Sequence, residues 1–233
     1  SMGVENGHAF KIMESVRKGK GLTEEMEQEM TANKVPDWYI WSCKRIKYMF
    51  PKAHACAYVM MAFRIAYFKV YYPLAYYAAY FSIRATAFNY ELMCQGREKL
   101  EFYMAEFKRR AASNDSTVKL SKKEEDTLKD MKIVQEMYAR GYEFLPIDIY
   151  RAKAHTFQVI EGKLMPALST IDGLGDKAAD QVVDAAAAGK FLSKDDFKTR
   201  SKVSGTVVDT MEALGLLGDL PATNQISFMD FLM

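Results

Sequence analysis

The chain has 233 residues, of which 49% are hydrophobic and 27% are charged, so it is long enough to bury one or two cores and its composition excludes a disordered protein. Its formal net charge of +2 excludes a uniformly acidic or basic protein, although the N-terminal third is basic and can attract phosphate. Three cysteines without a C-x-x-C pair argue against a disulfide framework or a zinc site, and we expect an intracellular, cytoplasmic protein.

Proline and glycine residues divide the first part of the chain into short predicted helices. Thr23 is a suitable N-cap for a helix that follows two glycines. Pro36, Pro51 and Pro73 each fit the beginning of a helix, where the missing amide hydrogen costs nothing. The expected helices cover residues 5–18, 24–33, 37–50, 51–72 and 73–85.

The most apolar stretch, residues 53–83, is not expected to cross a membrane. Arg64 would lie near the middle of a bilayer, at a cost of about 2.5–3.5 kcal/mol. Pro73 interrupts the run, and its tyrosines are spread along it instead of gathering at two ends. We therefore expect a buried core helix and no membrane partner.

The second half of the chain carries both helix and strand signals. Ser121 and Glu124 have the spacing of a capping box, which predicts a helix ending at Gly141. The sequence therefore predicts a mainly α fold with a few short strands near 142–165. The remaining expected segments are helices over 89–96 and 97–112, a loop over 113–120, extended stretches over 142–150 and 155–160 with a turn at 161–163, short helices after Pro166 and a tail from Pro221.

A glycine-rich turn is the clearest general motif. Ile171-Asp172-Gly173-Leu174-Gly175 precedes a helical run over 176–188. The glycines permit a tight turn and leave backbone amides uncovered, and the following helix N-terminus attracts anions. This pattern predicts a phosphate cradle that contacts a nucleic-acid backbone rather than its bases. A dinucleotide-binding fingerprint and a helix–turn–helix without a ligand are the two alternatives.

A degraded copy of the same turn follows at Lys202-Val203-Ser204-Gly205, between two further helical patterns. Two such units in tandem resemble the helix–hairpin–helix modules of polymerases, ligases and nucleases, which grip a duplex without regard to sequence. The candidate DNA-binding residues are Gly173, Leu174, Gly175, Lys177, Lys202, Ser204 and Gly205.

A basic and aromatic stretch over 44–54 is the second candidate site. Lys44 and Lys47 fall on one side of the expected helix, with Tyr48 and His54 nearby. Cations can hold a triphosphate while an aromatic face meets a base, which predicts a nucleotide-binding site. A solvated basic face beside a core helix is the alternative interpretation.

Several motifs in the same order resemble the C-family replicative DNA polymerases of the PolC type. Residues 13–22, 35–40, 48–55 and 66–70 resemble the fingers region of that family. The resemblance continues at 147–151, at 173–175 and at 224–228, and it covers essentially the whole chain.

The resemblance implies a division of labour within a DNA-directed DNA polymerase. Tyr48 and His54 would lie near the incoming deoxynucleoside triphosphate, and the helix–hairpin–helix pair would hold the product duplex. Catalytic aspartates and Mg²⁺ belong to the palm of such a polymerase, so we expect this chain alone to be inactive, with no catalytic residue, metal or cofactor of its own. The implied organisation is fingers over 3–118, a connecting helix and short strands over 119–165, the tandem helix–hairpin–helix over 166–220 and a clamp-binding tail over 221–233.

The tail resembles the pentapeptide Gln-Leu-Ser-Leu-Phe that binds the sliding clamp. The corresponding residues are Gln225, Ile226, Ser227, Phe228 and Met229, with departures at the fourth and fifth positions. The implied partners are thus duplex DNA, a deoxynucleoside triphosphate, the sliding clamp and the rest of a polymerase chain. The alternative is a stand-alone duplex-binding adaptor, which has no need of the stretch from Tyr48 to His54 or of a clamp peptide.

Overall fold

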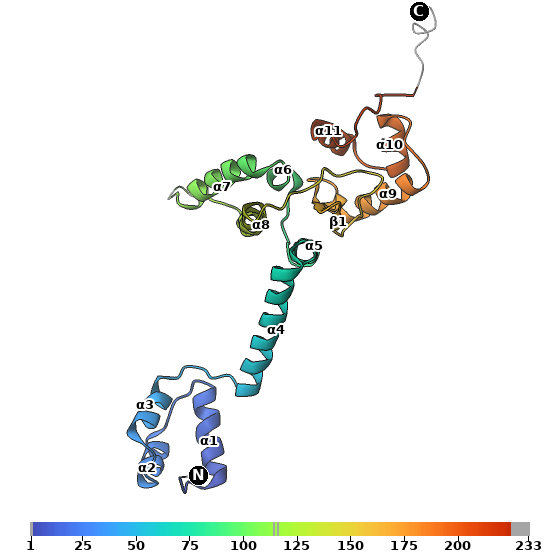
Figure 1. Ribbon diagram of the computed structural model, residues 1–233. Helices are drawn as coiled ribbons and strands as arrows, with labels where there is room; N and C mark the ends of the chain where they lie inside the picture. The colour runs from blue at the N-terminus through green and yellow to red at the C-terminus, as the bar shows by residue number, and fades with distance from the viewer. Residues whose placement is uncertain (1, 114, 116, 225–233) are drawn as a thin grey trace, which may run out of the picture. The chain divides into compact units, whose positions relative to one another are not determined.

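The computed structural model describes residues 2–113, 115 and 117–224, and it is mainly helical (Figure 1). The expected mainly α fold is confirmed. The chain divides into two compact units, one ending at Ala66 and the other beginning at Tyr67. Each unit is described here by itself.

Three helices build the first unit around a small core. They are α1 (Asn6–Arg17), α2 (Glu24–Ala32) and α3 (Asp37–Arg45). Thr23 caps α2 as expected, because its side chain accepts a hydrogen bond of 3.3 Å from the amide of Met26. The buried core residues of this unit are Ile12, Val16, Met30, Ile40 and Cys43.

The helix predicted over 37–50 is wrong at its C-terminal end, because α3 stops at Arg45. Ile46 is extended, with φ −71° and ψ 116°, and the chain then runs beside the end of α1. The Met49 amide donates to the Arg17 carbonyl at 3.1 Å, and Pro51 disfavours a helical conformation at the residue before it. Lys44 and Lys47 therefore do not share the helical side expected for them.

Helix α4 (Lys52–Tyr71) contributes residues to both units, and none of its 20 residues is buried. The buried core helix expected from its composition is thus wrong for this segment. Its large exposed side chains include Phe63, Phe68 and Tyr71, each more than half exposed. Among the described residues, no helix is long and apolar enough to cross a membrane.

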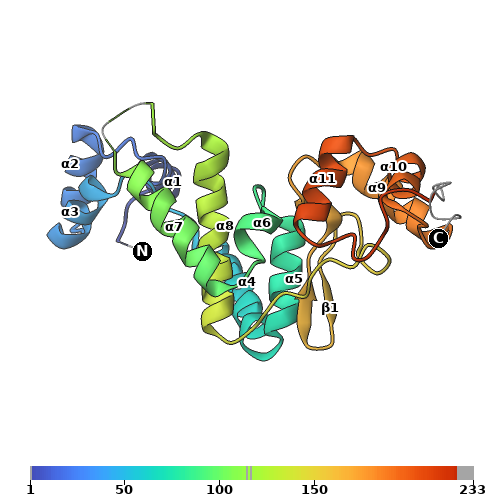
Figure 2. The same cartoon turned by 90° about the horizontal axis from the view of Figure 1, so that it is seen from above.

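The second unit begins with four helices whose ends follow local signals. These are α5 (Pro73–Ile83), α6 (Tyr90–Met93), α7 (Arg97–Ala111) and α8 (Lys122–Ala139). Pro73 occupies the first turn of α5, and the predicted capping box of Ser121 and Glu124 forms at the start of α8. Helices α7 and α8 pack side by side (Figure 2).

Two short antiparallel strands follow, β1 (Gln158–Ile160) and β2 (Lys163–Met165), with Gln158 opposite Met165. The turn joining them has Glu161 at φ 52° and Gly162 at φ 75°, as in a tight hairpin. The expected extended stretch over 142–150 forms only an isolated bridge, between Phe144 and Leu164.

The last part of the unit has its own hydrophobic core. It contains the short 3-10 helix η1 (Leu168–Thr170) and the helices α9 (Asp176–Ala187), α10 (Lys194–Ser201) and α11 (Gly205–Ala213). Leu168, Val182, Phe197 and Met211 are fully buried among these elements. This core fixes the two glycine-containing turns relative to each other.

Candidate nucleic-acid interface

The first hairpin joins η1 to α9 through a tight turn. Gly173 has φ +80°, and the Leu174 amide donates to the Ile171 carbonyl at 3.1 Å. The Leu174 side chain is buried, so it anchors the turn and leaves only its backbone for a ligand. Gly175 then caps α9 without a side-chain hydrogen bond. The first amides of α9 therefore point outward without a capping side chain.

The space above Gly175 is open. A Cβ atom built there would meet nothing within 4 Å, whereas one on Gly173 would contact Val207 Cγ2 at 3.7 Å. Packing within the protein thus gives no reason for a glycine at position 175, whose φ of −67° suits any residue. A phosphate approaching the α9 amides would use that open space.

The second hairpin repeats this backbone plan with different residues. Lys202 takes the left-handed position, with φ +56°, and the next side chain, Val203, is buried. Ser204 caps α11 by accepting a 3.3 Å hydrogen bond from the Val207 amide, and Gly205 is the first residue of that helix. Because the Ser204 hydroxyl already accepts a hydrogen bond from the Val207 amide, this hairpin has fewer backbone amides available for a phosphate than the first.

Arg200 of α10 connects that helix to the C-terminal end of α9 and was not singled out from the sequence. Its guanidinium donates to the carbonyls of Ala185, Gly189 at 2.9 Å and Lys190 at 3.0 Å, at the end of α9. The same group lies 4.6 Å from the ring centroid of Phe191. These contacts cap α9 and tie it to α10, and no local sequence signal identifies them.

Charges around the first hairpin are mixed. Lys177 is exposed, but Asp172, Asp176 and Asp180 are exposed as well. His155 Nε2 lies 3.0 Å from Asp180 Oδ1, and His155 Nδ1 lies 3.7 Å from Asp176 Oδ1. The hairpin therefore depends on neighbouring groups to offset its carboxylates.

In the first unit, four exposed rings form a continuous row, called here the aromatic row. Tyr48 meets Phe50 edge to face at 4.8 Å between centroids, and Phe50 stacks on His54 at 4.9 Å and 10°. His54 lies 4.4 Å from Tyr58. The predicted pair of Tyr48 and His54 is thus brought together, through Phe50, which sequence reasoning missed.

The cations predicted beside these rings are less available. Lys44 is paired with Glu27 of α2 at 2.5 Å, while Lys47 is exposed. The Glu14 carboxylate accepts a hydrogen bond of 2.6 Å from Arg17 Nε. Hydrogen bonds from Arg17 and then from Lys18 lower the pKa of Glu14 to about 2. Contact with Glu14, and more weakly with Tyr48, raises the pKa of Arg17.

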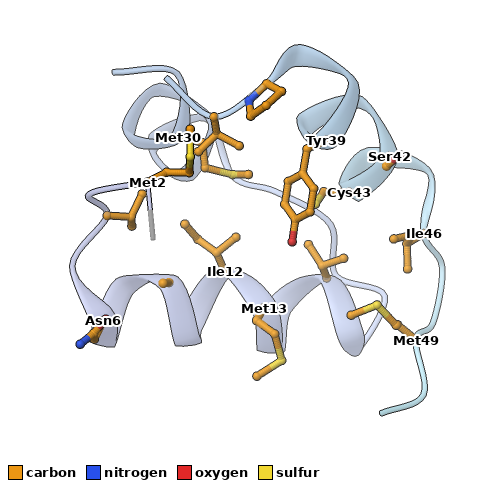
Figure 3. A pocket seen from close by; sticks show the side chains of 15 residues that line it. Met2, Asn6, Ile12, Met13, Met30, Tyr39, Ser42, Cys43, Ile46 and Met49 are labelled. Atoms are coloured by element: carbon orange, nitrogen blue, oxygen red, sulfur yellow. The ribbon is translucent and has the colours of Figure 1, made fainter. Parts of the chain in front are cut away.

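A separate cavity of 440 Å³ lies between α1 and the opposite helices of the first unit (Figure 3). Its walls are largely apolar and include Ile12, Met13, Met30, Tyr39 and Met49. The residues that line it include no lysine or arginine. This cavity therefore does not suit a triphosphate.

No group of three or more His, Cys, Asp or Glu residues is placed to hold a metal ion within the part of the chain that the structure describes. The predicted clamp-binding residues, Gln225 to Met229, lie outside the described residues.

Comparison with known proteins gives two findings. Residues 141–225 match the family described as "Helix-hairpin-helix motif". "DNA polymerase III PolC-type" proteins match almost the whole chain: that of Listeria welshimeri is 51% identical over 225 residues, that of Bacillus subtilis 48% over 225, and that of Caldanaerobacter subterraneus subsp. tengcongensis 47% over 227. Each alignment covers 97% of this chain. The chain spans only 15–16% of the length of these relatives.

Proposed function

Because this chain belongs to the PolC-type DNA polymerase III family, we propose that it is the duplex-binding and nucleotide-positioning part of a replicative DNA-directed DNA polymerase in the cytoplasm. The chemistry of nucleotidyl transfer would then belong to the rest of a longer chain. That part would supply the carboxylates and Mg²⁺, and this part alone would be inactive without them. The stand-alone adaptor remains the alternative, since it needs the hairpins but not the aromatic row.

The observation that carries this proposal is the repeated hairpin. Two turns of the same backbone plan, ending in Gly175 and Ser204, lie in one unit and precede α9 and α11. Exposed Lys177 and Lys202 flank them. Backbone amides and lysines contact phosphates without regard to base sequence, so the expected ligand is duplex DNA of any sequence.

The test is duplex binding by the chain, followed by fluorescence anisotropy over a range of salt concentrations. Gly175→Val fills the open space at a conformation that valine tolerates, so we expect at least a tenfold loss of affinity without loss of fold. Ala187→Val adds the same kind of bulk at the exposed far end of α9 and serves as the matched control. Equal binding by both variants would refute the hairpin as the contact.

For the incoming nucleotide, the proposal is supported by the exposed aromatic row. A base can stack on rings such as Tyr48 and His54, while Lys47 is free to meet phosphate and Lys44 would first have to leave Glu27. In the intact polymerase, Tyr48→Ala should raise the KM for deoxynucleoside triphosphates. A change confined to duplex affinity would favour the adaptor instead.

For the sliding clamp, the proposal depends on the tail sequence alone. Deleting residues 225–233 should abolish clamp binding in a pull-down or surface plasmon resonance assay. Duplex affinity should stay within a factor of about two, because the hairpins are intact. Unchanged clamp binding by the deletion variant would place the clamp site elsewhere.

A further inference from the structure

The first hairpin carries a carboxylate where a phosphate is expected. Asp172 lies within the turn, directly before Gly173, and its side chain is 65% exposed. A phosphate held by the α9 amides would be repelled by this charge. A cation close to Asp172 would therefore favour the binding of a phosphate at this hairpin.

That cation comes from a different element. Lys123, in the first turn of α8, places its Nζ atom 3.4 Å from Asp172 Oδ1, across 49 positions of sequence. Across the described ranges, Asp172 is the one carboxylate within 4 Å of Lys123 Nζ. Its neighbour Lys122 instead pairs with Glu125 at 3.7 Å and Asp126 at 3.5 Å, on α8 itself.

The backbone that carries Lys123 is well anchored. Ser121 and Glu124 form the capping box at the start of α8, and Glu124 also accepts from Arg110 at 2.6 Å. Thr127 donates to the Ala87 carbonyl at 3.1 Å. The backbone position of Lys123 beside the hairpin is thus set by the capping box and by the buried hydrogen bond of Thr127, while its ammonium group stays exposed.

The ion pair of Lys123 and Asp172 is weak, so Lys123 can exchange Asp172 for another anion. Both side chains are mostly exposed, at 75% and 65%, and their separation is long for an ion pair. A phosphate at the hairpin would offer Lys123 a second anion within reach of the same side chain. Neutralising a phosphate releases a bound counterion from DNA, which favours that exchange.

We propose that Lys123 is a further duplex-binding residue, whose ammonium group leaves Asp172 and contacts a phosphate of the strand held at the first hairpin. The duplex-binding surface then extends beyond the helix–hairpin–helix region to the start of α8. This inference rests on the proposed duplex binding.

The experiment measures the affinity of the chain for a duplex as a function of salt concentration. Lys123→Gln should reduce the slope of log K against log[salt] by about 0.9 and weaken binding about eightfold at 0.1 M salt, as expected for one lost phosphate contact. Lys122→Gln removes the same charge one residue away and should change neither value. Thermal melting of both variants checks that the fold is kept.

Asp172→Asn separates direct contact from mere neutralisation. If Lys123 touches phosphate, Lys123→Gln lowers the slope by the same amount in the Asp172→Asn background. If Lys123→Gln has no effect in that background, Lys123 only offsets Asp172, and the proposed contact is overturned. Unchanged binding by Lys123→Gln alongside a loss with Gly175→Val would refute this inference and leave the proposed function standing. A chain that binds no duplex at all would refute both.

Discussion

Removing the Arg200 side chain should loosen the helix–hairpin–helix core. In Arg200→Ala the carbonyls of Ala185, Gly189 and Lys190 lose a charged donor, and Phe191 loses the guanidinium over its ring. Two of these hydrogen bonds are exposed, so water replaces them at little cost, and the third is partly buried. Arg200 also forms an ion pair with Asp196 at 3.3 Å, one helical turn away. Adding the partly buried bond, the ring contact and a few tenths of a kcal/mol for this ion pair gives a loss of about 2 kcal/mol in the free energy of unfolding.

The assay must distinguish the two units. Both tryptophans of the chain, Trp38 and Trp41, belong to the first unit, so their fluorescence reports on that unit alone. Hydrogen exchange of the α9–α11 amides reports on the core that Arg200 ties together. We expect Arg200→Ala to speed exchange there roughly 30-fold, since 1.4 kcal/mol corresponds to about a factor of ten, and to leave the tryptophan transition unchanged.

Two controls sharpen the test. Arg200→Lys keeps the charge but not the planar fork, so it should recover less than half of the loss. Arg151→Ala removes an exposed arginine of the same unit whose partner is Glu161 at 3.3 Å, and should cost less than about 1 kcal/mol. Exchange rates in Arg200→Ala that match those of Arg151→Ala would refute the capping role of Arg200.

Two further predictions concern Gly19 and Glu124. Gly19→Ala would place a Cβ atom 1.9 Å from the Lys47 carbonyl oxygen at φ +74°, so the free energy of unfolding of the first unit, followed by tryptophan fluorescence, should fall by at least about 3 kcal/mol. Gly21→Ala is the control, because Gly21 has φ +76° with nothing within 4 Å, and it should cost only about 1 kcal/mol. Equal losses in the two variants would contradict the close approach. Hydrogen bonds from Arg110 and then from the Ser121 amide lower the pKa of Glu124 to about 2 from an ordinary 4.5, so the stability it contributes is complete above pH 4.5 and is lost as the pH falls through 2. Acid unfolding followed by hydrogen exchange of α8 should therefore be shallower in Glu124→Gln, and an unchanged profile would show that this carboxylate does not matter.

Local signals predicted much of the helical framework. Thr23, Pro73 and the pair of Ser121 and Glu124 each mark a helix start within one residue of its observed place. The turn with Gly173 and the following helix were also foreseen. Such signals act through backbone donors and φ angles a few residues away, so they are readable from sequence.

Predictions that depended on which residues are buried were less accurate. The composition of α4 indicated a buried helix, yet no residue of it is buried. An apolar composition indicates that burial of a helix would be favourable, but burial requires another segment that packs against the helix. The helix predicted through Tyr48 failed for a related reason, because the close approach of Lys47 to Gly19 and the Met49 hydrogen bond to Arg17 hold that segment extended.

The sequence by itself determined where most helices begin, where the two hairpins turn and which residue types surround them. Only the tertiary structure decided that Arg200 ties α9 to α10 and that Lys123 lies beside Asp172. Capping and turn formation depend on neighbours in the chain, whereas these contacts depend on how packed elements place side chains up to 49 residues apart. A pairing of that kind leaves no periodic or local mark in the sequence.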